Sequence, residues 1–185
     1  EAQKLSSKIN KELLDLEMTN AIINIKVEYK INEFFEDGKD SVQILIKTNV
    51  GENEGELSKI ASGGEMSRIM LAIKKVLTEV DRIPVVIFDE IDTGISGKAS
   101  RTVASKMKSI SKEHQVICVS HLAPIAAIAD YNYFISKKVE NERTTTSVQL
   151  LNEQEVICEI ARISSGEINE VTLKYANELR NQKAS

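Results

Sequence analysis

The spacing of apolar residues predicts a helix at the start of the chain and two strands after it. Near the N-terminus, apolar side chains recur every three or four positions among Lys and Glu, as on one face of a helix: Leu5, Ile9, Leu13 and Leu16. No capping residue stands before Glu1, so residues 1–18 are interpreted as the end of a longer connecting or coiled-coil helix, with an ordinary surface helix as the alternative. Apolar and polar residues then alternate over 21–29 and over 42–46, which predicts two half-buried strands joined by a turn at 36–39.

The middle of the chain alternates between helical and strand patterns. An apolar helical face follows Gly63, and further helices are expected over 97–110 and 122–129. Short apolar runs at 85–88 and 115–119 predict strands. Because the first of these runs does not alternate, both faces of its strand are expected to be buried, as in a parallel sheet. The order of strand, helix, strand and helix predicts an α/β fold with a parallel core.

The last third of the chain is expected to add strands and helices to this core. Two strands, at 131–136 and 144–150, flank a turn at Asn141. Two amphipathic helices follow, near 153–163 and 168–182.

Composition narrows the class of protein. The 185 residues are 42% hydrophobic and 28% charged, an ordinary globular balance, and no run approaches the ~20 apolar residues of a membrane span. The net charge of -4 gives no overall basic surface for nucleic acid, so a DNA contact needs a local patch or another part of the protein. Cys118 and Cys158 lie far apart in apolar contexts, which favours free thiols in a reducing cytoplasm over a disulfide.

Two carboxylates follow the first short apolar strand. Asp89 and Glu90 come directly after residues 85–88, and ligands of open α/β sheets bind beyond the carboxyl ends of the strands. An Asp at this point can hold Mg²⁺ through its water shell. The Glu beside it can orient or deprotonate the water that attacks a γ-phosphate. The alternative is a strand that ends in a solvated acidic turn.

A glycine pair marks the start of the helix before that strand. In Ser62-Gly63-Gly64-Glu65 the serine can cap the helix, and Ser-x-x-Glu is a capping box, so one interpretation is simply a well-capped helix. However, two glycines in a first turn cost ~1 kcal/mol each relative to alanine. They let backbone N–H groups at the positive end of the helix approach an anion, which favours a phosphate-binding helix start.

Two further candidates depend on their neighbours. The glycine-containing loop at 91–97 follows the acidic pair and is either a shaped functional loop or a plain connection. His121 ends the next strand and could reach the same crevice as Asp89 and Glu90, although a lone histidine is more often structural.

The sequence contains no Walker A phosphate loop. The nearest candidate, Gly94-Ile-Ser-Gly97-Lys98-Ala-Ser100, has two residues between the first glycine and the Gly-Lys pair where four are needed, and Ala99 stands where Ser or Thr should follow the lysine. The lysine and backbone cradle for β- and γ-phosphates are therefore missing. We predict that this chain alone does not hydrolyse ATP.

In combination, these segments resemble the C-terminal half of an ABC-type ATPase head, over residues 19–185. The resemblance implies these roles: signature motif for Ser62, Gly63, Gly64 and Glu65; Walker B magnesium ligand and catalytic carboxylate for Asp89 and Glu90; D-loop for Asp92, Gly94 and Ser96; switch histidine for His121. A head entered through a helix is similar to the SMC branch, in which a coiled coil separates the Walker A half from the signature half. The fold implied is α/β, a lobe with a parallel core, flanking helices and additional antiparallel strands.

Within the SMC branch, three segments resemble the RecN family: 60–72, 88–97 and 121–127. Glu65 stands where ABC transporters carry Gln, which fits the SMC-like branch and argues against a transporter. Ala123-Pro124, where Pro and then Gln are expected, is a minor departure.

The resemblance also implies cofactors and partners. The chain would belong to the ATP-hydrolysing head of a bacterial protein of double-strand-break repair and recombination, with ATP and Mg²⁺ as cofactors. Asp89, Glu90 and His121 would act in cis on ATP held by the N-terminal half of the same head, whereas the signature residues would act in trans across a homodimer of heads. DNA would bind through the full-length protein in the nucleoid region of the cytoplasm, without a membrane.

Two other functions stay open at this point. The chain could come from the head of another SMC-like ATPase, a chromosome-condensing or nuclease-associated one, which the coiled-coil length of the whole protein would distinguish. It could also be a non-catalytic half-head that docks a partner, although the Asp89-Glu90 pair argues against this because docking needs no magnesium chemistry. Any half-head should expose a sheet edge and apolar surface where the other half is missing.

Overall fold

The computed structural model describes the chain as two compact units, Glu1–Val119 and Ser120–Ser185. The described residues are 1–31, 36, 38–49, 51, 53–57, 62–95, 97–140 and 143–182. Part of the turn predicted at 36–39, the turn predicted at Asn141 and the D-loop candidate Ser96 lie outside them.

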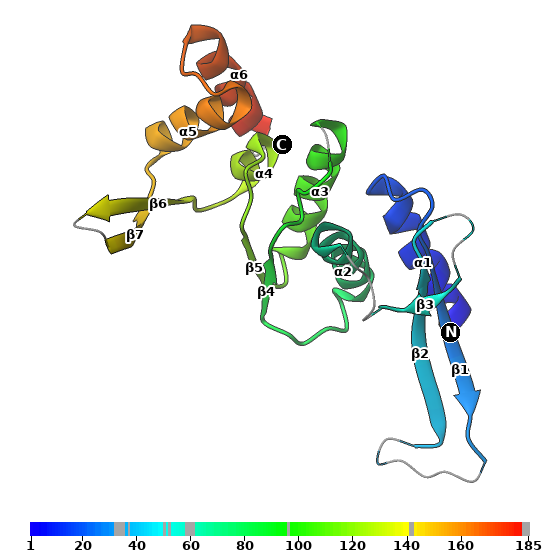
Figure 1. The fold of residues 1–185 in the computed structure, drawn as a ribbon. Coiled ribbons are helices and arrows are strands. Elements are labelled where there is room, and N and C mark those ends of the chain that lie inside the picture. The colour runs from blue at the N-terminus through cyan, green and yellow to red at the C-terminus, as the bar shows by residue number, and fades with distance from the viewer. Residues whose placement is uncertain are drawn as a thin grey trace. The chain divides into compact units, whose positions relative to one another are not determined.

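Among its described residues, the first unit holds an antiparallel sheet, a parallel strand pair and three helices (Figure 1). Its elements are α1 (Ala2–Asp15), β1 (Ile22–Tyr29), β2 (Asp40–Lys47), β3 (Gly55–Glu56), α2 (Gly63–Leu77), β4 (Val85–Phe88), α3 (Gly97–Ile110) and β5 (Gln115–Cys118). Strands β1, β2 and β3 form the antiparallel sheet in that order, and β4 pairs with β5 in parallel. The sequence pattern did not predict the short strand β3.

Helix α1 packs on the base of the β1–β2 ribbon. Leu13 and Ile23 are almost completely buried, and the side chain of Asn10 forms a hydrogen-bonded pair with the backbone of Ile23, at 3.0 Å to its carbonyl and 2.7 Å from its N–H. Lys106 of α3 makes an ion pair with Asp15 at 2.9 Å. Helix α1 is thus an integrated part of this unit, and its continuation into a coiled coil stays a prediction.

The outer half of the β1–β2 ribbon is more exposed than the alternating pattern predicts. Ala21 and Ile23 are buried at the base, whereas Val27 is 50% exposed and its cross-strand neighbour Val42 is 62% exposed. The ribbon extends beyond the end of α1 (Figure 1), so that helix covers only its base. An alternating pattern identifies the apolar face of a strand, but not whether another element covers that face.

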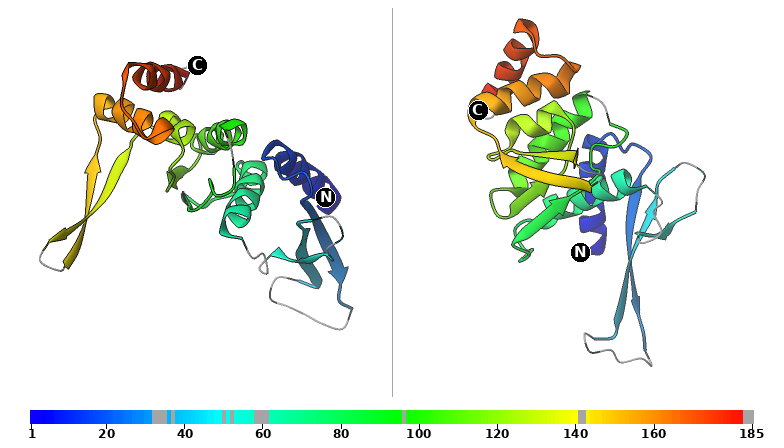
Figure 2. Two further views of the ribbon diagram at one scale, coloured as in Figure 1. Left: turned by 45° about the horizontal axis from the view of Figure 1, so that its top comes forward. Right: turned by 60° about the vertical axis from the view of Figure 1, so that its left-hand side comes forward.

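The prediction that both faces of β4 are buried is wrong. Val86 and Phe88 are buried, but Val85 is 38% exposed and Ile87 is 67% exposed. Ile117, the partner of Ile87 in β5, is also exposed. Helices α2 and α3 run alongside the strand pair (Figure 2), so one face is covered, and within the described part of the chain the other apolar face has no cover. Apolar side chains are therefore exposed on this face of the strand pair.

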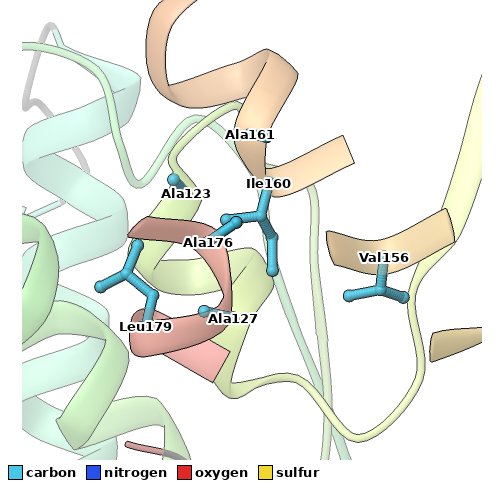
Figure 3. Close-up of a cluster of buried hydrophobic side chains, with 7 residues drawn as sticks. All are labelled: Ala123, Ala127, Val156, Ile160, Ala161, Ala176 and Leu179. Carbon is cyan, nitrogen blue, oxygen red and sulfur yellow. The ribbon is translucent and has the colours of Figure 1, made fainter. Parts of the chain in front are cut away.

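The part of the second unit that the structure describes is built from three helices and a pair of antiparallel strands. Its elements are α4 (Ala123–Ile128), β6 (Tyr133–Glu140), β7 (Arg143–Leu150), α5 (Glu153–Ser165) and α6 (Glu170–Asn181), with β6 and β7 antiparallel. Small and branched side chains of the three helices interlock in one core (Figure 3): Ala123, Ala127, Val156, Ile160, Ala161, Ala176 and Leu179. Capping boxes at Asn152 and Asn169 fix the starts of α5 and α6, because their side chains satisfy N–H groups that the helices leave unpaired.

Both cysteines are unpaired thiols, as predicted. Burial raises the pKa of Cys118 to about 12, with smaller contributions from the negative charges of Asp92 and Asp89. None of the described helices is both long enough and apolar enough to cross a membrane.

Candidate functional site

The start of α2 is fixed by its cap and by its buried stripe. The helix begins at Gly63, as predicted, and the Ser62 hydroxyl accepts the N–H of Glu65 at 3.5 Å. Gly64, Arg68 and Ala72, at a spacing of four residues, are all buried. This stripe turns the first two turns of α2 toward the segment that follows β4.

The segment that follows β4 is a tight acidic turn, residues 89–93. The Asp89 carboxylate accepts the N–H of Glu90 at 2.9 Å, and the N–H of Thr93 donates to the Glu90 carbonyl at 3.0 Å. Glu90 has φ +56°, in the left-handed region that non-glycine residues rarely adopt. Such conformations cost about 1–3 kcal/mol and persist only where the surroundings enforce them, often at functional sites. Both acidic side chains are exposed.

The two glycines of α2 contact this acidic turn directly. A Cβ atom at Gly63 would collide with Oε2 of Glu90, so the Glu90 carboxylate lies at the positive end of α2. A Cβ atom at Gly64 would lie 2.9 Å from Cβ of Thr93 and 3.0 Å from the Glu90 carbonyl oxygen. Packing therefore already accounts for the missing side chain at Gly64. Gly63 meets only the end of a flexible side chain, the Glu90 carboxylate, which occupies the helix end.

Two side chains of α2 tie the helix to the acidic turn. The Ser67 hydroxyl donates to the carbonyl of Asp89 at 2.6 Å. Nη1 of Arg68 donates to the carbonyls of Thr93 at 2.7 Å and Ile91 at 3.4 Å. Neither residue was predicted from the sequence to have a role in the site. One signal in the sequence could have pointed to Arg68: it is a charged residue, yet its position in the helical repeat lies on the face of α2 that is buried.

The other site candidates are placed as follows. Asp92 is 5% exposed and has a polar partner, and Gly94 has φ +74°, which a glycine adopts at little cost. His121 lies in the second unit, in the turn before α4, and its participation in a common site with the acidic turn stays a prediction. The structure thus brings together the signature candidates, the acidic pair and Asp92, all within the first unit.

The carboxylates present fit Mg²⁺ shared with a nucleotide rather than a metal held by this chain alone. Nowhere in the described ranges do three His, Cys, Asp or Glu side chains gather into a possible metal site. Asp89 offers one exposed carboxylate, of which Oδ1 already accepts the Glu90 N–H. One carboxylate suffices for Mg²⁺, because the ion keeps several waters and takes its remaining oxygens from phosphates.

The two glycines should tolerate alanine very differently. We expect Gly64→Ala to lower the free energy of unfolding by roughly 1–3 kcal/mol, the usual cost of overpacking, because backbone atoms of the acidic turn cannot yield easily. Gly63→Ala should change it by less than about 1 kcal/mol, because the Glu90 side chain can rotate away. Denaturant unfolding of the two variants measures the difference, and equal losses would contradict the contacts described here.

Comparison with known proteins finds homologues of the chain. No family model matches the chain. It is 38% identical to the DNA repair protein RecN of Bacillus subtilis over 98% of its length, and 41% identical to that of Halalkalibacterium halodurans over 96%. Over nearly all of its length, the chain is a homologue of one part of RecN. It spans about a third of the length of these RecN relatives, 34% and 32%.

The fold of the chain is that of a lobe of the SMC head. It matches the Smc head domain of Pyrococcus yayanosii with a TM-score of 0.58 and 18% identity, covering 88% of this chain and 29% of that one. A chain from work on ATP-driven dimerization and DNA-stimulated activation of SMC ATPases matches with a TM-score of 0.50 and 19% identity, covering 90% of this chain and 94% of that one. The predicted α/β head lobe and the resemblance to RecN are both confirmed.

Proposed function

We propose that this chain is the C-terminal part of the ATP-binding and ATP-hydrolysing head of a protein that repairs DNA double-strand breaks by recombination. The observation that carries the proposal is the direct packing of a glycine-opened helix end on an acidic turn, with Gly63 against Glu90. A positive helix end binds phosphate, and carboxylates beside it supply a magnesium ligand and a group that activates water. The relatives that share the sequence are named DNA repair proteins, which supports the biological setting.

Each polar group of the site then has a task. Asp89 holds Mg²⁺ through its water shell, and Glu90 orients the attacking water and accepts its proton. The backbone N–H groups at Ser62, Gly63 and Gly64 bind the γ-phosphate. His121 contacts the same phosphate, while Asp92, Gly94 and Ser96 shape the loop beside it. Mg²⁺, when bound with ATP, neutralises charge on the transferred phosphoryl group.

The remaining parts of the site come from other polypeptide segments. The N-terminal half of the same head supplies the Walker A lysine and covers the exposed face of β4 and β5, where Ile87 is 67% exposed. A second head supplies the signature helix in trans, so that ATP joins two heads and hydrolysis separates them. The matching structure from the study of ATP-driven dimerization and DNA-stimulated activation of SMC ATPases supports this arrangement. DNA binds to the full-length protein in the bacterial cytoplasm.

Phosphate binding at the start of α2 requires Glu90 to move. Its carboxylate lies at the same helix end, and two negative groups there would repel each other. Because the Glu90 side chain is exposed, it can turn away without breaking a packed core. When a nucleotide binds, its phosphate therefore replaces the Glu90 carboxylate at the helix end.

Reconstitution tests the proposal. The chain alone should release no phosphate from ATP above the uncatalysed background, whereas the chain co-expressed with the segment that carries the P-loop should hydrolyse Mg²⁺-ATP. Turnover by the chain alone would contradict the missing-P-loop argument. If the assembled pair binds ATP but never hydrolyses it, the docking-module alternative is favoured instead.

A further inference from the structure

Arg68 is a charged residue in the buried stripe of α2, and the proposed chemistry gives it no task. It is 8% exposed, and its Nε atom is buried without a hydrogen-bond partner among the described atoms. Burial lowers the pKa of the guanidinium, an effect that the negative charge of Glu65 opposes. An arginine still keeps its proton under such conditions, so a charge is held inside the unit.

This burial is costly for a residue with only a packing role. Moving a guanidinium out of water is unfavourable unless its donors find acceptors, and a leucine or methionine would fill the same stripe without that cost. The acceptors that Arg68 does find are two backbone carbonyls of the acidic turn, Ile91 and Thr93. The side chain therefore serves the conformation of that turn.

The acidic turn is held to α2 on both sides of Glu90. Before it, the Ser67 hydroxyl holds the carbonyl of Asp89 at 2.6 Å. After it, Arg68 holds the carbonyl of Thr93 at 2.7 Å. Glu90 itself adopts the left-handed conformation, which relaxes unless its neighbours enforce it. Release of the second contact would let the Glu90 backbone, and with it the carboxylate, move relative to the helix end.

We propose that Arg68 is a positioning residue for ATP hydrolysis, which fixes the backbone of the acidic turn to α2 so that the Glu90 side chain starts from a defined place when it acts on the attacking water. The inference rests on the proposed function and deepens it, since Arg68 acts through Glu90 and touches no nucleotide. Any movement of α2 would then move the acidic turn with it, because hydrogen bonds from Ser67 and Arg68 join the two segments. Misplacement of a reacting group by ~1 Å can cost about a hundredfold in rate.

The test compares Arg68→Met with Arg82→Met in the assembled head. Arg82 is exposed in the connection between α2 and β4, so its replacement controls for the loss of one positive charge. We expect Arg68→Met to lower kcat about tenfold or more while the KM for ATP changes less than about threefold, the pattern of a lost contribution to the transition state. Amide exchange at Thr93, whose N–H is bonded to Glu90, should accelerate, whereas Arg82→Met should match the parent in both measurements.

Further variants separate positioning from mere stability. Arg68→Lys keeps the charge but not the planar fork, so its kcat should lie between those of the parent and Arg68→Met. If Arg68→Met does not fold, Arg68→Lys and Ser67→Ala are compared with the parent and with Arg82→Met instead. Each of the two should lower kcat more than it changes the KM for ATP. Parental kcat in the folded variants, or equal losses of kcat and ATP affinity, overturns the inference.

Turnover of Glu90→Gln, measured beside that of Arg68→Met, shows whether the positioning role alone fails or the proposed function fails as well. If Glu90→Gln is inactive but Arg68→Met turns over like the parent, only the positioning role fails. If Glu90→Gln turns over like the parent, the role of the acidic turn fails, and the role of Arg68 fails with it.

Discussion

Replacement of Glu90 by glutamine should stop ATP turnover in the assembled head while ATP binding persists. The amide cannot accept a proton from water, and loss of a general base typically costs about 10²–10⁴-fold in rate. The substitution also removes the negative charge that lies at the start of α2 beside Gly63, so nucleotide binding and ATP-dependent head pairing should both increase. Steady-state phosphate release, equilibrium binding of ATP and size-exclusion chromatography with Mg²⁺-ATP measure the three effects.

The control for this variant is Glu79→Gln. Glu79 is exposed in the turn after α2, so it reports the loss of one carboxylate away from the site. Gln and Glu have similar shapes and similar backbone preferences, so both variants should unfold within about 0.5 kcal/mol of the parent. Parental turnover by Glu90→Gln would remove this residue from the chemistry.

The sequence predicted best the features that depend on neighbouring residues alone. Helix α3 has the predicted bounds, and α2 begins at the predicted glycine, because an apolar face and a capping serine are local signals. The parallel pairing of β4 with β5 also followed from the order of the elements. Strand burial was predicted less well. Ile87 is as apolar as Phe88, and only the presence of a covering element decides which of the two is buried.

The candidate site divides in the same way. Its carboxylates and glycines could be picked out because their residue types and order are unusual for plain structure. The left-handed conformation of Glu90 and the packing of Gly64 on Thr93 could not be predicted, since both depend on how α2 and the acidic turn meet in space. A buried arginine such as Arg68 is hard to recognise for the same reason. Its acceptors are backbone carbonyls, which every residue carries and no sequence pattern marks.

The contact between α2 and the acidic turn raises a question that the family resemblance alone would not pose. Gly63 and Glu90 touch within one chain, so a phosphate at this helix end could be served by the carboxylate of the same chain. The proposed trans arrangement instead pairs the helix end of one head with the carboxylate of another. Activity of single variants cannot separate these cases, because each variant damages a site in both arrangements.

Mixing two inactive heads separates them, and we expect activity to return. Ser62→Arg blocks the helix end with a long side chain, whereas Glu90→Gln removes the carboxylate. Ser62 is suited to this role because its hydroxyl caps the N–H of Glu65 and does not hold the acidic turn. In a trans dimer with two equivalent sites, half of randomly mixed dimers are heterodimers, and each has one intact site. The mixture should therefore reach about a quarter of parental phosphate release.

The matched control is a mixture in which both substitutions are placed in the same head. The double variant Ser62→Arg/Glu90→Gln, mixed with parental heads, forms heterodimers in which every trans site carries one defect. Those heterodimers should be inactive, so about a quarter of parental activity remains, from the parental homodimers alone. A cis arrangement changes both results: the first mixture has no activity, and the second keeps about half of the parental activity. Ser62→Ala, which loses the cap at a cost of ~1 kcal/mol but blocks nothing, should keep most of the parental turnover and shows that obstruction causes the effect of arginine.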